Sequence, residues 1–346
     1  MENNQKATMK PKTKKFLIII AVVMAVLLLV CLVVYIVVNV FLNSIGRVDP
    51  DAVYGSKDPA AVFQNGEPIE NLPANGQAEE LFAGKNVINI LLVGQDRREG
   101  EEEGPQRTDA MLLCTFDKDK KTVTLTSFLP DLWVYIPNLY NQRLNIPYKL
   151  GGFPLLNDTL EYNFGVRADY NIEMDFAGFM KAVDLVGGVT IQLTAAEAKY
   201  LNQRGNWDIE ENQQWQLREG ENLLNGSQTL AYTRIKHLGT DFGRANRQST
   251  VMIALAKKLE GISSADLFDI SREIFPLLCT DMTNNQMLQL LLQLLPLISE
   301  LKIQSQTIPL SGQYQYEKKG EFDVLVLNKD QFEISKQLLR ETIRSK

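Results

Sequence analysis

The sequence predicts an α/β protein, an α+β sandwich in which a central mixed sheet is flanked by helices and preceded by one N-terminal transmembrane helix. Three observations lead to this prediction. Short apolar runs bounded by turn residues alternate with amphipathic segments over most of the chain. One long uncharged run lies near the N-terminus. The chain has 346 residues, 45% of them hydrophobic, which is enough for one large packed domain.

The first element is the long apolar run, residues 16–38, which contains no charged side chain. It is long enough to cross a hydrocarbon core of about 30 Å as a helix, and longer than the apolar part of a secretory signal. Five lysines precede it and few basic residues follow closely, so the N-terminus is expected in the cytoplasm and the rest outside. We predict a basic tail over residues 1–15 and an anchor over residues 16–42.

A spacer is expected between the membrane and the folded part. Residues 43–85 are rich in proline, glycine, asparagine and acidic side chains, a composition typical of a linker. From residue 86 the hydrophobic pattern becomes that of a globular protein. The predicted extracellular domain is therefore residues 86–346.

The strands of this domain are predicted from apolar runs and their flanking turns. Residues 110–116 and 122–128 are separated by a charged turn and indicate a hairpin. The run LAYTRIK is interpreted as a further strand. Strands are expected over residues 87–93, 110–116, 122–128, 189–193, 230–236 and 323–328.

The helices are predicted from amphipathic spacing and from capping residues. Thr194-x-x-Glu197 and Thr283-x-x-Gln286 are capping boxes, each of which opens a helix. A glycine at residue 261 ends another amphipathic segment. Further helices are expected over residues 155–164, 176–185 and 248–259, and from the last strand to residue 344.

Composition excludes several classes of function. The single histidine, His237, excludes sites with several histidine ligands, and it is more readily a spectator than a base. The three cysteines form no C-x-x-C pair, which excludes a zinc ribbon and a thioredoxin motif, although Cys114 and Cys279 are a conceivable disulfide. The net charge of −6 and the pI near 5.2 argue against a general nucleic-acid binder. P-loop, nucleophile-elbow and zincin signatures are absent from the sequence.

The first candidate site follows the strand at residues 87–93. Asp96 stands beside Arg97 and Arg98, and Asp109 with Arg107 opens the next strand. Carboxylates at strand edges beside arginines suit a hard cation such as Mg²⁺ and the phosphate oxygens that it bridges. The alternative, which the spacing alone favours, is that these side chains decorate an exposed loop.

The second candidate site is a concentration of basic groups over residues 234–248. Arg234 and Lys236 alternate along the predicted strand, whereas Arg244, Arg247 and Gln248 have the spacing of one helix face. In so acidic a chain, this cluster fits a clamp for linked phosphates. The alternative is a solvated face with ion pairs to nearby carboxylates.

The order and spacing of these motifs resemble the LytR–CpsA–Psr family of bacterial cell-envelope proteins. The resemblance extends from about residue 86 to residue 343 and includes an N-terminal anchor. It is carried by the segments NILLVGQDRR, RTDAMLL, SFLPDLWVYIP, RLN, DLVGGV, LNGSQTLAYTRIK and TDFGRANRQ.

The resemblance implies a Mg²⁺-dependent phosphotransferase of cell wall assembly. Members of this family move anionic glycopolymers, such as teichoic acids or capsular polysaccharide, from a polyprenyl-diphosphate carrier to peptidoglycan. It implies membrane attachment and no nucleic-acid partner. The resemblance implies Asp96 and Asp109 as metal ligands. The residues that it implies at the reaction centre are Arg234, Lys236, Asp241, Arg244 and Gln248, with Asp241 positioning the phosphates or acting as a base. The further phosphate-binding groups that it implies are Arg98, Arg143 and Arg247.

Two positions depart from the family pattern. Pro130 stands where the family has an arginine, and proline offers neither a cation nor an N–H group. Lys236 stands where a second arginine is usual, which keeps the charge but loses the planar fork. Losing one preorganised donor can lower a rate by about 100- to 1,000-fold. Arg143 and Arg97 are the candidates to compensate.

Three other functions use the same features. A catalytically weak binder or sensor of polyprenyl-diphosphate glycans is favoured by Pro130. A lipid-diphosphate hydrolase would differ only in having water as the acceptor. A transcriptional attenuator is opposed by the sequence, because residues 1–15 are too few for a DNA-reading fold.

Overall fold

The computed structural model describes residues 38–47, 81–95, 107–203, 215–236, 238–294, 297 and 300–344. The chain divides into two compact units, Met1–Ser44 and Ile45–Lys346. In the first unit, residues 38–42 are helical, and the predicted tail and residues 16–37 of the predicted anchor lie outside the described residues. No helix in the described part of the chain is both long enough and apolar enough to cross a membrane.

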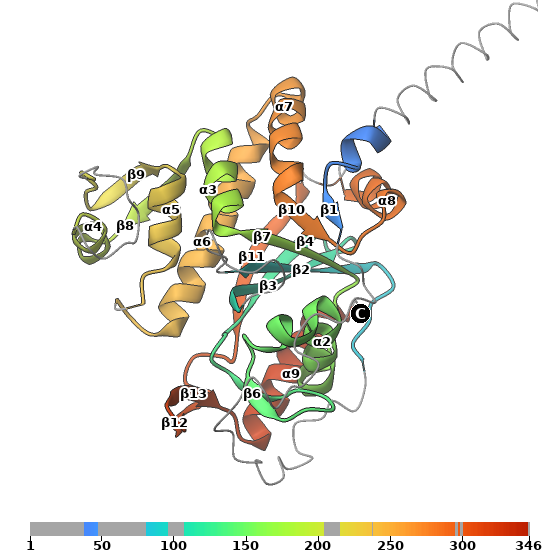
Figure 1. The fold of residues 1–346 in the computed structure, drawn as a ribbon, viewed down its shortest axis with the longest axis vertical. Helices are drawn as coiled ribbons and strands as arrows, with labels where there is room; N and C mark the ends of the chain where they lie inside the picture. The colour runs from blue at the N-terminus through green and yellow to red at the C-terminus, as the bar shows by residue number, and fades with distance from the viewer. Residues whose placement is uncertain are drawn as a thin grey trace, which may run out of the picture. The chain divides into compact units, whose positions relative to one another are not determined.

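A mixed seven-stranded sheet forms the centre of the second unit (Figure 1). The middle strands β2, β3 and β4 pair antiparallel, whereas β7 runs parallel to β2 and β11 runs parallel to β4. In order across the sheet, the strands are β1 (Gly46–Arg47), β10 (Leu278–Thr280), β7 (Tyr170–Asp175), β2 (Val87–Gln95), β3 (Thr108–Asp117), β4 (Thr122–Phe128) and β11 (Lys302–Ile308).

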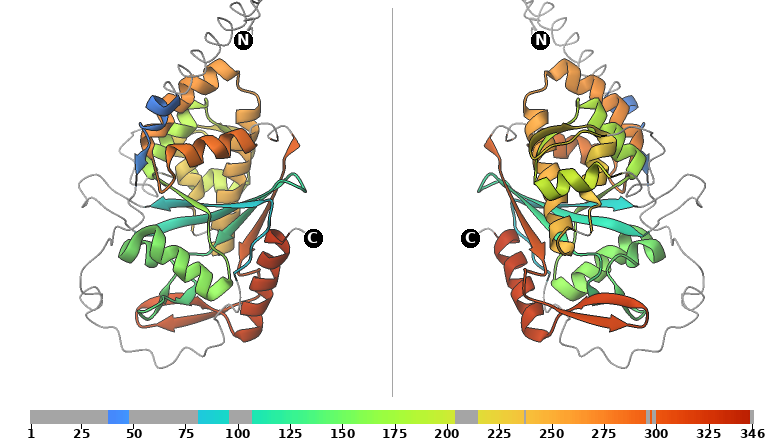
Figure 2. Two further views of the ribbon diagram at one scale, coloured as in Figure 1. Left: turned by 90° about the vertical axis from the view of Figure 1, so that its right-hand side faces the viewer. Right: turned by 90° about the vertical axis from the view of Figure 1, so that its left-hand side faces the viewer.

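Helices cover both faces of this sheet (Figures 1 and 2). One face carries α3 (Phe176–Leu185), α5 (Gly226–Thr233), α6 (Asp241–Glu260), α7 (Ser264–Ile274) and α8 (Asn284–Leu294), with the short η2 (Phe275–Leu277) after α7. The other face carries α2 (Pro147–Phe164) and α9 (Lys329–Ile343). The remaining elements are the hairpins β5 (Trp133–Tyr135) with β6 (Asn141–Arg143), β8 (Val189–Leu193) with β9 (Gly220–Leu224) and β12 (Gln315–Lys319) with β13 (Phe322–Val326), and the helix α4 (Ala195–Leu201).

The core has a layer on each face of the sheet. On β2, Leu91 and Val93 point to the α2 and α9 side, whereas Ile90 points to the side of α6 and α8. This alternation follows from the two-residue period of a strand. Burying one such side chain contributes about 1.5–3 kcal/mol, so both faces hold helices. A third cluster joins α3, α5 and α6 to the β8–β9 hairpin.

Most of the predicted elements are confirmed. The central hairpin forms from β3 and β4, and the predicted helix 176–185 and strand 189–193 match α3 and β8. The Thr194 and Thr283 side chains accept hydrogen bonds from the backbone N–H groups three residues on, as a capping box requires. The mixed sheet flanked by helices is thus the predicted fold class, while α2 and α6 begin earlier than expected.

The predicted strand over residues 230–236 is wrong, because α5 occupies residues 226–233. Asn225 and Gln228 form a capping box that the sequence analysis did not recognise, with the Asn225 side chain accepting from the Gln228 N–H. Apolar residues of this helix, Ala231 and Tyr232, pack into the third core cluster. Local capping and helical packing therefore prevail over the strand-like composition of this segment.

Two further expectations are corrected. Gly46–Arg47, inside the predicted spacer, form the edge strand β1 and pair in parallel with β10. Cys114 and Cys279 do not form a disulfide with each other. Their strands, β3 and β10, are separated in the sheet by β2 and β7, and three strand spacings of about 4.8 Å each exceed the reach of a disulfide.

Candidate active site

The segment that follows β4 is held in place by backbone hydrogen bonds from three directions. The Pro130 carbonyl accepts from the Asn145 N–H at 3.1 Å, and the Asp131 carbonyl accepts from the Leu325 N–H at 2.9 Å. The Leu129 N–H donates to the Ile308 carbonyl at the end of β11 at 3.0 Å. The position of Asp131 is therefore determined by strands that are distant in sequence.

Asp131 is the centre of a cluster of two carboxylates and two arginines. Arg244 Nη2 lies 3.3 Å from Asp241 Oδ1 and 3.6 Å from Asp131 Oδ2. Arg143 Nη1 lies 3.3 Å from Asp131 Oδ1. The Arg244 side chain is only 6% exposed, whereas the two carboxylates are about one quarter exposed. We call Asp131, Arg143, Asp241 and Arg244 the acid–arginine cluster; it is buried on one side and open to solvent on the other.

The start of α6 brings this cluster to the edge of the sheet. Thr240 is in an extended conformation before the helix, and Asp241 occupies its first turn, where a negative charge is favoured by the helix dipole. One turn beyond Arg244, the Gln248 Nε2 donates to the Asp109 carbonyl at 3.3 Å. Gln248, on the predicted helical face, therefore lies beside the start of β3, while Arg244 on the same face lies at Asp131 and Asp241.

The environment of Asp241 changes its acidity. Burial raises the pKa of Asp241, and the neighbouring Asp131 carboxylate raises it further. The positive charges of Arg244 and Lys236 lower it. The net effect is a pKa above the ordinary value for an aspartate. A carboxylate with a raised pKa is a better proton acceptor than an exposed one. Asp241 is thus suited to the role of a base.

Aromatic side chains border the cluster. The ring of Phe242 stacks on Tyr314 with centroids 5.0 Å apart, and Tyr316 meets Tyr314 edge-on at 5.2 Å. Burial of its hydroxyl, the hydrogen bond with Tyr314 and the charges of Asp241 and Asp131 raise the pKa of Tyr316 to about 12. The β12–β13 hairpin therefore lies against the open side of the cluster, which the sequence analysis did not anticipate.

Arg247 does not face this cluster, although its spacing predicted that it would share a helix face with Arg244 and Gln248. Its Nε donates to Glu197 Oε1 at 2.7 Å, and its terminal nitrogens donate to the carbonyls of Ile235 (3.1 Å) and Leu238 (2.6 Å). The guanidinium is buried over the ring of Tyr232. Arg247 therefore has a structural role and is not one of the phosphate-binding residues that we propose.

Replacing Arg247 with methionine is expected to destabilise the fold by about 3–5 kcal/mol, because Glu197 is left buried without its cation. Burial alone would raise the pKa of Glu197, but hydrogen bonds from Thr194 and Arg247 outweigh it and hold the pKa below its ordinary value of 4.5. This stabilisation is present above pH 4.5 and is lost as the pH falls through the lowered pKa. Denaturant unfolding at pH 7 and pH 4 should therefore show a smaller difference between wild type and variant at the lower pH.

The matched control is the double variant Arg247→Met with Glu197→Gln. It removes the unpaired charge and should recover part of the lost stability. An Arg247→Met protein as stable as wild type at pH 7 would contradict the structural role.

The other basic groups of the predicted clamp, Arg234 and Lys236, do not lie on a strand. Arg234 caps the C-terminus of α5, and its guanidinium carbon lies 4.9 Å from the ring centre of Phe176 at the start of α3. Lys236 is exposed in the connection to α6 and is close enough to act electrostatically on Asp241. The two side chains therefore do not share a strand face as predicted, and Lys236 is the one shown to influence the cluster.

The predicted metal site is described only in part. Asp96 and Arg98 lie outside the described residues, as does His237. Asp109 is the second residue of β3. The preceding Thr108, whose N–H donates to the Asn145 carbonyl at 3.4 Å, and Asn145 each have a buried side-chain oxygen with no hydrogen-bond partner among the described residues. Within the described ranges, no group of three or more His, Cys, Asp or Glu side chains could hold a metal. One carboxylate with neutral oxygens is nevertheless compatible with Mg²⁺, which commonly binds one or two carboxylates together with substrate phosphates.

Comparison of the sequence with models of known protein families identifies the family of this chain. A model of the LytR_cpsA_psr family matches residues 58–341. The chain belongs to this family. The family resemblance of the sequence motifs is thereby confirmed, and the match begins within the predicted spacer.

Two curated relatives and two solved structures show how far the similarity extends. Regulatory protein MsrR of Staphylococcus aureus (strain COL) is 33% identical over 175 residues, which are 50% of this chain and 49% of MsrR. This chain thus matches about half the length of that relative. The polyisoprenyl-teichoic acid–peptidoglycan teichoic acid transferase TagT of Bacillus subtilis (strain 168) is 29% identical over 264 residues, 75% of this chain and 78% of TagT.

Among solved structures, B. subtilis TagT has a TM-score of 0.60 at 22% identity, covering 78% of this chain and 97% of that chain. TagT with bound octaprenyl pyrophosphate lipid has a TM-score of 0.57 at 22% identity, covering 78% and 96%. At this identity the structural matches show a shared fold, the mixed sheet flanked by helices.

Proposed function

We propose that this protein is a phosphotransferase that moves an anionic glycopolymer from a polyprenyl-diphosphate carrier to peptidoglycan. The observation that carries the proposal is the acid–arginine cluster, in which a buried arginine faces a carboxylate of raised pKa at a solvent-open edge. The name of the relative TagT states a transfer of this kind. TagT structures that share the fold contain octaprenyl pyrophosphate lipid.

The described residues can bind and orient a diphosphate. The Arg244 Nη2 atom is buried and makes no hydrogen bond of its own, although it lies between the two carboxylates. Lys236 adds an exposed positive charge beside Asp241. Cations held in a partly buried site stabilise the charge that develops on phosphoryl oxygens.

The proposed reaction forms one bond and breaks one. A sugar hydroxyl of the wall attacks the phosphorus that carries the glycan, and the bond from that phosphorus to the bridging oxygen breaks. Asp241 accepts the hydroxyl proton, and polyprenyl phosphate leaves with the bridging oxygen and its electron pair. Arg244 holds both Asp241 and the phosphates, so the base and the reacting group are positioned together.

Magnesium and membrane attachment are part of the proposal. Asp109, with Asp96 as the second predicted ligand, would hold Mg²⁺. The ion would supply neutralising charge on the diphosphate oxygens. We further propose that residues 16–38 anchor the protein, with the domain outside the cell, because this places the site where a membrane-borne carrier lipid is accessible.

A binder or sensor is the second candidate, and one observation favours it. Pro130 is buried beside Asp131 and provides no cation where the family has an arginine. Arg143, which contacts the same aspartate, supplies a cation from another strand. Because Arg143 provides the cation that Pro130 lacks, we favour an active enzyme over a binder.

The test uses the full-length protein in detergent with Mg²⁺, a prenyl-diphosphate-linked glycan and peptidoglycan fragments. We expect metal-stimulated release of prenyl phosphate together with glycan attached to peptidoglycan. Release that yields free glycan phosphate instead would indicate a hydrolase. Binding without release would indicate a sensor, and absence of both would contradict the assignment of the site.

The pH dependence of kcat/KM should show the ionisation of the catalytic base. Since Asp241 must be ionised to accept a proton and its pKa is raised, the activity should rise with pH through an acid limb above the ordinary value of 3.8. Asp241→Asn should remove this limb and lower the rate by about 100-fold or more. An unchanged acid limb in Asp241→Asn would assign the base to another group.

A further inference from the structure

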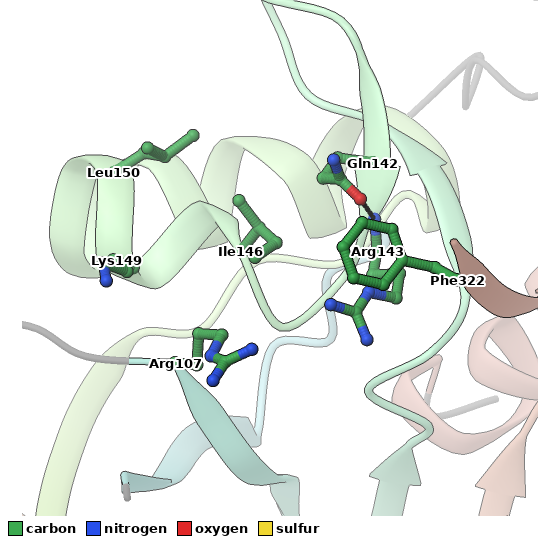
Figure 3. Close-up of a pocket in the computed structure, with 7 residues that line it drawn as sticks. All are labelled: Arg107, Gln142, Arg143, Ile146, Lys149, Leu150 and Phe322. Carbon is green, nitrogen blue, oxygen red and sulfur yellow. Dashed lines mark hydrogen bonds between the residues drawn. The ribbon is translucent and has the colours of Figure 1, made fainter. Parts of the chain in front are cut away.

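A pocket of about 170 Å³ lies beside the acid–arginine cluster (Figure 3). Its walls come from four parts of the chain: the start of β3, the β6 strand, the first turn of α2 and the start of β13. Arg143 belongs both to this pocket and to the cluster. The lining residues, which we call the basic pocket, are Arg107, Gln142, Arg143, Ile146, Lys149, Leu150 and Phe322.

The basic pocket is positively charged in an otherwise acidic chain. Three of its lining side chains are cationic and none is acidic, although the whole chain has a net charge of −6. Arg107 and Lys149 are exposed, and within the described part of the chain neither forms an ion pair. Unpaired cations of different elements that face one pocket favour an anionic ligand.

Arg143 is held in a fixed position at the boundary of the pocket. Its guanidinium carbon lies 4.2 Å from the ring centre of Phe322, and its Nη1 faces Asp131. Figure 3 shows the ring of Phe322 lying over Arg143. The Arg143 Nε is buried and has no hydrogen-bond partner among the described residues, so this donor is not satisfied within the protein.

The pocket also has an apolar side. Phe322 is 41% exposed, and Ile146 and Leu150 line the same space. A ligand that suits these walls combines an anionic group with a carbon-rich face, as a phosphate linked to a polyol or sugar does. Arginine and lysine are the side chains that bind phosphate most often.

Asp131 separates the basic pocket from the proposed diphosphate site. One of its carboxylate oxygens faces Arg143 and the other faces Arg244. A carboxylate between two arginines repels an anion that would bridge them. The geometry therefore provides two anion sites, one on each side of Asp131.

We propose that the basic pocket binds a phosphodiester of the glycan chain itself, distinct from the diphosphate that reacts. This inference rests on the proposed function and narrows the donor to a phosphate-bearing glycopolymer. In this arrangement the pocket holds a repeating unit of the polymer while the linkage to the carrier lies at Asp241 and Arg244.

The experiment compares two donors with the full-length protein: a prenyl-diphosphate disaccharide, and the same molecule extended by glycerol-phosphate units. The variants are Lys149→Gln and the charge reversal Lys149→Glu. Arg218→Gln and Lys257→Gln, at exposed positions outside the pocket, are matched controls. We expect Lys149→Glu to lower kcat/KM for the extended donor by about 10- to 100-fold, since a charged hydrogen bond contributes about tenfold or more and the reversed charge repels the phosphodiester, and to leave the short donor within about threefold.

Binding of a glycerol-phosphate oligomer without lipid, measured by calorimetry, tests the pocket independently of turnover. We expect wild type and both controls to bind it and Lys149→Glu to lose at least tenfold in affinity. An equal loss of kcat/KM for both donors would place the pocket in the diphosphate site and overturn the inference, as would unchanged kinetics and binding. If wild type turns over neither donor, the proposed function fails, while oligomer binding still decides the role of the pocket.

Discussion

Arg244→Gln is expected to lower the rate of prenyl phosphate release by about 100- to 1,000-fold. The Arg244 side chain is nearly buried and lies between Asp131 and Asp241, so its charge is held in a fixed position between the two carboxylates. Without it, the two carboxylates repel each other and the diphosphate loses its nearest cation. The loss should therefore appear mainly in kcat, with the acid limb of the pH profile shifted to higher pH.

Arg244→Lys is the matched control for charge. It keeps a cation but loses the planar fork that can face two oxygens at once, and it should retain an activity between those of wild type and Arg244→Gln. Thermal unfolding of each variant separates loss of fold from loss of chemistry. A folded Arg244→Gln protein with more than a tenth of the wild-type rate would refute the central role of this arginine.

Arg143→Ala is expected to lower the rate by about 100-fold, and Pro130→Arg should restore much of that loss when the two substitutions are combined. Pro130 precedes Asp131, and Arg143 already contacts that aspartate from β6. The two positions are therefore alternative sources of one cation. The Pro130 carbonyl, which accepts from the Asn145 N–H, is retained in any substitution, so this backbone hydrogen bond is kept in the variant.

Pro130→Ala on the Arg143→Ala background is the matched control, because it removes the ring without adding a charge. It should restore nothing. In the otherwise wild-type protein, Pro130→Arg should change the rate by less than about threefold, as the cation is already present. A gain of tenfold or more from Pro130→Arg alone would show that Arg143 does not compensate, and would favour the binder or sensor.

The fold was largely predictable because its elements are locally encoded. The apolar run of β2 and the hairpin of β3 and β4 follow from strand periodicity and a charged turn. The capping boxes at Thr194 and Thr283 are signals four residues long. The strand prediction over residues 230–236 failed because the Asn225–Gln228 capping box was overlooked, which is also a local signal.

The candidate site was predictable only in its residue types. Helical spacing correctly predicted that Arg244 and Gln248 lie on one helix, α6. The same spacing grouped Arg247 with them, although its guanidinium turns toward Glu197. Asp131 was not among the predicted site residues, and the sequence signal that could have found it is an acidic residue three positions after the end of a buried strand.

The sequence by itself determined which segments form strands and helices, where several helices begin, and that basic groups gather at residues 234–248 in an acidic chain. Only the tertiary structure decided that Asp131 joins Arg143 to Arg244 and that Phe322 closes a basic pocket beside them. The physical reason is range. Periodicity and capping act over a few residues, whereas these contacts depend on the packing of β6, α6 and β13, which are far apart in the chain.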